Sequence, residues 1–294
     1  MNRMSKQKTT RIRLNKGWSH DEKFIVKEGQ DTVLLRVLDA SKLSRKIKEM
    51  DYLSDLDLGE CAFSTPLSVE LVNDKVHYVT SYLQGVDLEE VITDLSESEQ
   101  IRLGLQAGCL LKQIHSQIRV KEDHSWAKEY SAKIDRKIQS YRACGLRFDH
   151  DDALIEKVSS LKTFLEDRPV TFQHGDYHSG NFLLCENGNL GILDFDRWDI
   201  GDPWEEFNRI VWCREKSPLF ASAMIQGYFD FDVPKTFFPL MFLYVATNAI
   251  GSIVWAQGYS DDEVSVMLHL IKRLDEDTDH FTLIVPCWFQ TIQL

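Results

Sequence analysis

One segment of the chain, Gln173–Asp194, constrains the fold and the chemistry more than any other part of the sequence. The residues at 170–172 are apolar or β-branched, which is typical of a short buried strand. Two further apolar runs flank the turn sequence at 186–189 and predict a β-hairpin. Because that hairpin would return Asp194 to the side of Asn181, the sequence predicts a small oxygen-rich site at the ends of strands.

Three side chains of this segment suit the transfer of a phosphoryl group. Asp176 could orient a hydroxyl group and accept its proton. Asn181 offers a neutral amide oxygen and Asp194 offers a carboxylate. Together these two could hold Mg²⁺, which takes oxygen ligands and is usually bound through only one or two carboxylates.

A zinc site is an alternative use of the same stretch. His174, Asp176 and His178 alternate along an extended segment and could supply three ligands. That arrangement would leave Asn181 and Asp194 without a role, so we favour the phosphoryl-transfer interpretation. On its own, His174 is interpreted as a buried scaffold residue of the loop.

The pattern H-G-D-x-x-x-x-N followed by D-F-D resembles the aminoglycoside phosphotransferase family of small-molecule kinases, and also the H-R-D-x-x-x-x-N and D-F-G pair of protein kinases. The likeness continues through Gly201–Phe207 and extends from the loop at Gly17 to Trp288. It implies a two-lobed α+β, protein-kinase-like fold. Residues 1–84 would form a small antiparallel-sheet lobe that binds nucleotide, and residues 85–294 a larger helical lobe with the catalytic loop and the acceptor site.

The resemblance also implies residues that contact the nucleotide. Gly17 would let the backbone approach phosphate, and Ser19 would donate its hydroxyl or amide. Arg36 stands where the family carries its phosphate-binding Lys or Arg, and Arg differs from Lys in being planar and bidentate. A helix carboxylate would pair with Arg36, with Glu49 as the first candidate and Asp51 as its rival.

A hinge between the lobes is expected at 81–85, where backbone groups of the family bind the purine. Ser81 and Leu83 are the expected positions. The implied activity is transfer of the γ-phosphoryl group of ATP or GTP to a hydroxyl of a small molecule, with Mg²⁺ as cofactor. An aminoglycoside acceptor would make the protein an antibiotic-resistance enzyme, and kinases of amino alcohols, sugars or other metabolites share the motif.

Periodicity predicts the remaining elements. Five strands and one helix are expected before the hinge, and the chain after it reads as mainly helical. In the first helix, over 41–56, the apolar positions are Ile47, Met50 and Leu53. Further expectations concern the helix starts: a capping box at Ser96 and Glu99, Asp151 or Asp152 before the helix at 153–166, and Asp202 with Pro203 before a later helix.

The charge and the cysteines bear on partners and compartment. A net charge of −12 argues against general nucleic-acid binding and suits a cationic substrate or plain solubility. Among acidic groups near the site, Asp199, Glu205 and Glu206 are candidates for contact with substrate ammonium groups. The six cysteines contain no C-x-x-C pair. With the polar Met1–Arg13 segment, they predict a reduced, cytoplasmic protein without a secretory signal.

The uncharged run at 236–257 is long enough to be weighed as a membrane span. Because Pro, Thr, Asn, Gly and Ser interrupt it, we predict a buried helix of the larger lobe and no membrane contact. Two other classes of protein remain open from the sequence. One is a non-catalytic nucleotide-binding or scaffold protein, and the other is a metal-dependent hydrolase that ignores nucleotide.

Overall fold

The computed structural model describes residues 10–14, 21–120 and 125–293. The chain divides into two compact units. The first unit contains Met1–Val86 and Phe182–Phe195, and the second contains Asp87–Asn181 and Asp196–Leu294.

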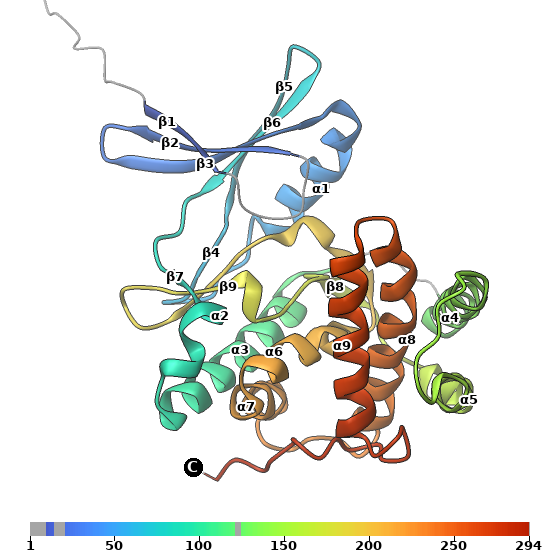
Figure 1. Cartoon of the computed structure of the whole chain (residues 1–294). Coiled ribbons are helices and arrows are strands. Elements are labelled where there is room, and N and C mark those ends of the chain that lie inside the picture. The colour runs from blue at the N-terminus through green and yellow to red at the C-terminus, as the bar shows by residue number, and fades with distance from the viewer. Residues whose placement is uncertain (1–9, 15–20, 121–124, 294) are drawn as a thin grey trace, which may run out of the picture. The chain divides into compact units, whose positions relative to one another are not determined.

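The first unit is built on an antiparallel sheet of five strands in the order β1-β2-β3-β6-β5 (Figure 1). Two tight turns set its register: Gly29 lies in the left-handed region between β2 and β3, and Asn73 and Asp74 do so between β5 and β6. Leu38, Val76 and Tyr78 form a small core on this sheet. The strands are β1 (Thr10–Leu14), β2 (Glu22–Glu28), β3 (Asp31–Asp39), β5 (Pro66–Val72) and β6 (Lys75–Ser81).

Helix α1 (Leu43–Leu53) follows β3 after the short 3-10 turn Ala40–Lys42. Its buried side chains are Lys46, Glu49 and Leu53, so that of the three apolar positions noted in the sequence Leu53 is buried, Met50 is half-buried and Ile47 is exposed. Lys46 and Glu49 form a buried ion pair, with Lys46 Nζ 2.7 Å from Glu49 Oε2. A buried charge is tolerated when it is paired and hydrogen-bonded, and the Tyr78 hydroxyl donates to Glu49 Oε1 at 2.7 Å.

A second sheet of the first unit contains the hairpin predicted from the sequence. Strands β9 (Phe182–Leu184) and β10 (Leu190–Ile192) are antiparallel, with Ile192 opposite Phe182. The two-residue strand β4 (Ala62–Phe63), which the sequence did not predict, pairs with β10 in parallel. The sheet order is β4-β10-β9-β7, where β7 (Val86–Asp87) lies at the end of the unit.

The sequence predicts one continuous helical lobe over 85–294. In the structure, Phe182–Phe195 belongs to the first unit. Pairing of β10 with β4 explains this difference, because it ties the hairpin to residues near position 62. Grouping by contact does not establish which segments fold alone, so the lobe boundary at residue 84 stays a prediction.

The second unit is mainly helical (Figure 1). Ser96 begins α3 as predicted, because its Oγ accepts from the Glu99 N–H at 3.3 Å. His150, not Asp151 or Asp152, precedes α5. The α-helices are α2 (Leu88–Val91), α3 (Glu97–Gln117), α4 (Trp126–Ala143), α5 (Asp151–Leu161), α6 (Ile210–Lys216), α7 (Pro218–Tyr228), α8 (Phe237–Gln257) and α9 (Asp261–Asp277).

Short elements connect these helices. Strands β8 (Thr171–Gln173) and β11 (Asp199–Gly201) pair antiparallel, with Ile200 opposite Phe172. The 3-10 turns are η2 (Ile92–Asp94), η3 (Lys162–Leu165), η4 (Ser179–Asn181), η5 (Phe195–Arg197) and η6 (Pro203–Arg209). Asp202 caps η6 as predicted, because Oδ1 accepts from the Trp204 N–H at 2.9 Å and Pro203 follows. The predicted helix after Pro203 therefore starts as a 3-10 turn before α6.

Close helix packing forms the core of the second unit. An added Cβ at Gly108 in α3 would lie 2.1 Å from the Met224 carbonyl oxygen in α7, so these helices approach at backbone distance. The predicted stripe on α5 and η3 is buried as expected: Leu154, Val158, Leu161 and Leu165. The fold class is confirmed as α+β, with an antiparallel sheet in the N-terminal region and helices in the C-terminal part.

Helix α8 is long and apolar enough to cross a membrane by length and composition alone. Its most apolar window is 61% buried inside the protein. It packs against α4, α5 and α9, and Figure 1 shows α8 and α9 side by side. Burial of this extent is typical of a core helix, which passes the same test, so the composition is weak evidence for a membrane span.

Candidate active site

The loop after β8 places Asp176, and its shape depends on Gly175. Gly175 has a φ of +82°, and an added Cβ would lie 2.0 Å from the Arg197 carbonyl oxygen. Only glycine fits a left-handed residue with backbone at that distance. The Gly175 N–H donates to Glu206 Oε1 at 2.7 Å, which ties the loop to η6. Both contacts explain why glycine precedes the aspartate in this motif.

His174 and Tyr177 hold the two sides of the loop. His174 is fully buried, and its Nδ1 accepts from the Asp176 N–H at 3.3 Å. Tyr177 is also buried, and its hydroxyl donates to the Ala107 carbonyl in α3 at 2.8 Å. These contacts agree with the scaffold role predicted for His174.

Three positively polarised or charged groups surround the Asp176 carboxylate. Arg209 Nε lies 3.1 Å from Oδ1, His178 Nε2 lies 3.7 Å from Oδ1, and Arg197 Nε lies 3.8 Å from Oδ2. Burial by itself raises the pKa of Asp176, but His178, Arg209 and Arg197 outweigh it and hold the pKa well below its usual range. The carboxylate therefore stays ionised throughout the neutral pH range.

Asn181 closes the loop from its far end. Its Nδ2 donates to the Asp176 carbonyl oxygen at 2.8 Å, and its backbone N–H donates to the His178 carbonyl at 2.9 Å. Because the amide nitrogen is used in this way, the amide oxygen is the side-chain atom left to bind a cation.

Glu206 lies beneath the loop as a buried carboxyl group. Burial, together with the nearby Glu205 and Asp176 charges, raises its pKa to about 8. The hydrogen bond from the Gly175 N–H acts in the opposite direction. Its Oε2 is buried and has no hydrogen-bond partner among the described residues. Glu205 pairs with Lys133 at 3.1 Å. Both glutamates are buried, so the expectation that they face substrate ammonium groups is wrong.

Asp202 braces the same region through its carboxylate. It is fully buried, and its carboxylate accepts from Arg168 at 2.6 and 2.9 Å and from the Tyr244 hydroxyl at 2.6 Å. Burial, together with this carboxylate, raises the pKa of Tyr244 well above its ordinary value. A carboxylate with this many donors is structural, and it fixes η6 and hence Arg209.

In the first unit, the hairpin β9–β10 presents Asp194 just after its second strand. The residue adopts a φ of +59°, in the left-handed region. Its Oδ1 is buried but has no hydrogen-bond partner in the described part of the chain. Arg36 Nη1 lies 3.6 Å from this oxygen and supplies the nearest positive charge that we identify. Asp194 Oδ1 thus has an arginine nearby but no hydrogen-bond donor in the described part of the chain.

Arg36 is buried on β3, and Asp21 anchors it. Arg36 Nη2 donates to Asp21 Oδ2 at 2.9 Å, and Lys42 Nζ donates to both oxygens of Asp21 at 3.0 and 3.1 Å. Burial raises the pKa of Asp21, but these two cations lower it below its ordinary value. The structure thereby adds a residue that the sequence did not single out, while phosphate binding by Arg36 stays a prediction.

The other nucleotide-contact predictions have different outcomes. Glu49 engages Lys46 and Tyr78, and an Arg36–Glu49 pair stays a prediction. The Ser81 N–H donates to the Thr65 carbonyl at 2.8 Å, so purine binding at Ser81 would use its carbonyl oxygen. Binding through the backbone of Leu83 also stays a prediction. Gly17 and Ser19 lie outside the described residues.

Each of the two predicted magnesium ligands, considered in its own unit, has an oxygen suited to the ion. Asn181 has an amide oxygen left over from its hydrogen bond, and Asp194 has a buried carboxylate oxygen without a donor. Oxygen ligands with one carboxylate suit Mg²⁺. The zinc alternative is not supported. Among the described residues, the side chains of His, Cys, Asp or Glu that lie close enough in a group of three to hold one metal ion are His150, Asp275 and His280. His174, Asp176 and His178 do not form such a group.

A cavity in the second unit lies between α4 and α8. Its lining includes Lys133, Arg136 and Lys137, together with Trp255. Burial lowers the pKa of Lys137 to about 8, as does the neighbouring Lys133 charge. Since three basic side chains line this cavity, it does not match an acidic pocket for a polycationic substrate.

Three side chains at the loop were not predicted from the sequence. Arg209 and Arg197 lie beside the Asp176 carboxylate, and Glu206 accepts from the Gly175 N–H. Arg209 lies at the end of η6, beyond the recognised Asp202-Pro203 start, and Arg197 follows the Asp-Phe-Asp motif directly. Proximity to the motif was the one available signal, and it does not say which side chain turns toward Asp176.

The fold and the Asp176–Asn181 loop define a phosphotransferase of the protein-kinase-like class, and comparison with known proteins agrees. The model of the phosphotransferase enzyme family (APH) matches residues 10–237. The chain belongs to this family. A comparison with curated proteins found no match.

Solved structures share the fold at low sequence identity. A thermostable mutant of aminoglycoside phosphotransferase APH(4)-Ia, in a ternary complex with ADP and hygromycin B, is 17% identical, with a TM-score of 0.65 over 90% of this chain and 92% of that one. ADP-bound APH(2'')-Ib is 18% identical, with a TM-score of 0.60 over 89% and 92%. A putative aminoglycoside phosphotransferase from Ralstonia eutropha JMP134 is 13% identical, with a TM-score of 0.65 over 91% and 92%.

Proposed function

We propose that this protein is a Mg²⁺-dependent small-molecule kinase that moves the γ-phosphoryl group of ATP or GTP to a hydroxyl group. The observation that carries the proposal is the Asp176 carboxylate, which the surrounding cations keep ionised in a loop that Asn181 closes. Family membership supports a phosphoryl donor, and the solved relatives include complexes with ADP and AMP-PNP.

Asp176 would orient the acceptor hydroxyl by accepting its hydrogen bond. A base with a pKa far below neutrality is a weak proton acceptor, so its main contribution is to position the hydroxyl for in-line attack. The proton would pass to Asp176 only late in the transfer, as the bond from the hydroxyl oxygen to phosphorus forms and the nucleoside diphosphate leaves.

Asn181 and Asp194 would hold the magnesium ion. When bound, Mg²⁺ neutralises charge on the phosphate oxygens and fixes their orientation. Arg36 and Ser19 are proposed to steady the triphosphate, and backbone groups of Ser81 and Leu83 the purine.

The acceptor class is the open part of the proposal. An aminoglycoside-like acceptor is supported by family membership and by relatives solved with hygromycin B or gentamicin. The burial of Glu205 and Glu206 removes two acidic groups that we expected to recognise such a cation. Kinases of amino alcohols, sugars or other metabolites are therefore retained beside antibiotic resistance. We propose the cytoplasm, where nucleoside triphosphates are available, as its location.

The test is Mg²⁺-dependent release of ADP and GDP against a panel of aminoglycosides, amino alcohols and sugars. We expect one acceptor class to stimulate release, and Asp176→Ala to abolish that stimulation while still binding nucleotide. The matched control is Asp167→Asn, an exposed aspartate at a left-handed position that Asn accepts well.

Two results would contradict the proposal and identify its rivals. Nucleotide binding without turnover across a broad metabolite panel would favour a non-catalytic nucleotide-binding protein. Absence of nucleotide binding, together with tight binding of a transition metal and hydrolysis of a test ester, would favour a metal-dependent hydrolase.

A further inference from the structure

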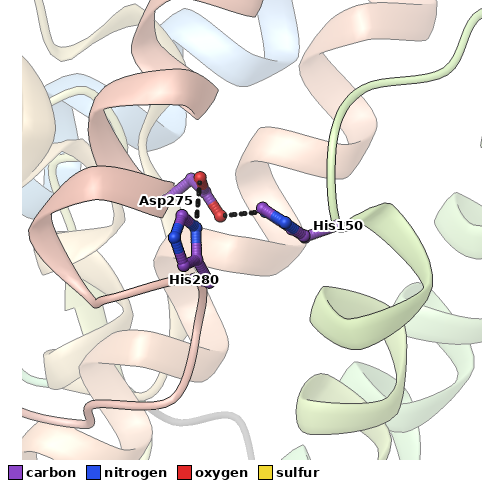
Figure 2. Close-up of side chains that lie close together, drawn as sticks. All are labelled: His150, Asp275 and His280. Atoms are coloured by element: carbon purple, nitrogen blue, oxygen red, sulfur yellow. Dashed lines mark hydrogen bonds and ion pairs between the residues drawn. The ribbon is translucent and has the colours of Figure 1, made fainter.

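Three potential metal ligands meet on the second unit, away from the Asp176 loop in sequence. Figure 2 shows His150, Asp275 and His280 turned toward one another. His150 Nδ1 lies 2.9 Å from Asp275 Oδ1, and His280 Nδ1 lies 3.1 Å from Asp275 Oδ2. One carboxylate therefore faces two imidazoles, one through each of its oxygens.

The backbone places these side chains from three separate segments. His150 immediately precedes α5 and has a φ of +62°, and Asp275 lies in the last turn of α9. His280 follows α9, has a φ of +56°, and donates its backbone N–H to the Asp275 carbonyl at 2.9 Å. A residue other than Gly in the left-handed region carries a conformational cost. Both histidines adopt this conformation.

Both imidazoles place a nitrogen at a ligand-like distance from the carboxylate, each from a different oxygen. One ligand atom from each residue can be chosen so that all three lie within 4.8 Å of one another. Zinc bonds to His nitrogen and carboxylate oxygen are about 2.0–2.2 Å long, which places tetrahedral ligand atoms about 3.3 Å apart. The two nitrogen-to-oxygen distances, 2.9 and 3.1 Å, lie close to that separation.

The exposure of the three groups permits an ion to enter. The imidazoles are 45% and 61% exposed, whereas the Asp275 side chain is 12% exposed. A buried carboxylate with two solvent-reachable imidazoles leaves the outer side for water as a further ligand. Two nitrogen ligands and one carboxylate favour a transition ion over Mg²⁺, which prefers oxygen.

We propose that His150, Asp275 and His280 form a binding site for a divalent transition-metal ion, with Zn²⁺ as its preferred occupant. Each imidazole would bind through Nδ1 and keep its proton on Nε2. The ion would tie the start of α5 to the end of α9 and to the segment after it. This site is independent of the magnesium ligands proposed for phosphoryl transfer.

The first experiment titrates ZnCl₂ into chelator-treated protein without a polyhistidine tag, by calorimetry, with excess Mg²⁺ present to occupy oxygen sites. We expect one Zn²⁺ per chain, and loss of affinity of at least about tenfold in both His280→Ala and Asp275→Asn, because two ligands hold the ion less well than three. The apparent Tm should rise with Zn²⁺ in the unmodified protein and not in these variants.

His269→Ala is the matched control. His269 also lies on α9 and also faces a carboxylate, Glu215, with Nε2 at 3.1 Å. Because that pair lacks a second imidazole, the variant should bind Zn²⁺ like the unmodified protein. Equal loss in His269→Ala and His280→Ala would overturn the proposal, as would Zn²⁺ binding that neither Asp275→Asn nor His280→Ala weakens.

A spectroscopic test does not depend on the variants folding. Co²⁺ bound to the unmodified protein should give the strong visible absorption of a four- or five-coordinate ion, which Zn²⁺ should displace at one equivalent. Absence of a saturable Co²⁺ spectrum would overturn the site. Circular dichroism of each variant shows whether a lost signal reflects a lost ligand or a lost fold.

Discussion

Asp176 and Asp194 are both motif aspartates, but their surroundings differ. Asp176, in the second unit, has Arg209, His178 and Arg197 around its two oxygens. Asp194, in the first unit, has one buried oxygen without a hydrogen-bond donor and one arginine at 3.6 Å. The first carboxylate is held in place by charge, and the second keeps an oxygen available for a cation. The same residue type thus suits two roles because its neighbours differ.

The largest expected effect is on kcat, and the dependence of the rate on Mg²⁺ should distinguish the roles of the two aspartates. Both Asp176→Asn and Asp194→Asn should lower kcat by roughly 10²–10⁴-fold. In Asp194→Asn, half-maximal activity should need at least about tenfold more Mg²⁺, because the ion loses a carboxylate ligand. In Asp176→Asn, the Mg²⁺ requirement should stay the same. Initial rates across a Mg²⁺ titration check this, and equal Mg²⁺ curves for both variants would remove the distinction.

A smaller effect is expected from Arg209, which acts on the reaction through Asp176. Arg209→Met should lower kcat by roughly 10- to 100-fold, because the carboxylate loses the contact that positions it. Removal of this cation also raises the pKa of Asp176, and the ionised form is the active one. Because His178 and Arg197 also lower this pKa, Asp176 should stay ionised in the variant at neutral pH, and the rate loss should be about the same at every pH tested.

The measurement for Arg209 is kcat/KM between pH 4.5 and 8. Arg102→Met serves as the control, since Arg102 makes a surface pair with Glu99 on α3 and should leave the pH profile unchanged. A rate loss that grows toward pH 4.5 would show instead that Arg209 is needed to keep Asp176 ionised.

The third expected effect is on stability rather than on rate, through Glu206. Its pKa is about 8 in the folded protein and near 4.5 when unfolded, so the folded state binds more protons between these values. The free energy of unfolding should therefore decrease as pH rises from about 5 to 8. Glu206→Gln keeps an oxygen for the Gly175 N–H and removes this titration. The free energy of unfolding of this variant, relative to the unmodified protein, should accordingly increase with pH by an amount on the order of a few kcal/mol, and its relative Tm should rise with it.

Thermal unfolding at pH 5, 6.5 and 8 measures the Glu206 effect. Glu186→Gln, in the turn between β9 and β10, is the control and should give a pH-independent difference. A constant Tm difference for Glu206→Gln would mean that Glu206 is ionised in the folded state at neutral pH.

Much of the scaffold could be predicted from local patterns. The hairpin 182–192, the Ser96 cap and the stripe on α5 follow from alternation, turn residues and helical spacing, which act over a few residues. The helix after β3 shows where such patterns fail. Ile47 shares the spacing of Met50 and Leu53 but is exposed, whereas Lys46 and Glu49 are buried as a pair that Tyr78, on a strand distant in sequence, joins by a hydrogen bond.

The sequence alone determined the polar groups of the motif, their order, and Gly175 between His174 and Asp176. Those features are local, since chain geometry within a few residues decides which loop can form. Only the tertiary structure decided that Arg209 reaches Asp176, that Glu206 is buried under Gly175, and that His150 meets Asp275 and His280. Each of these contacts joins segments that packing brings together, and the spacing of residues along the chain carries no record of which side chains then face one another.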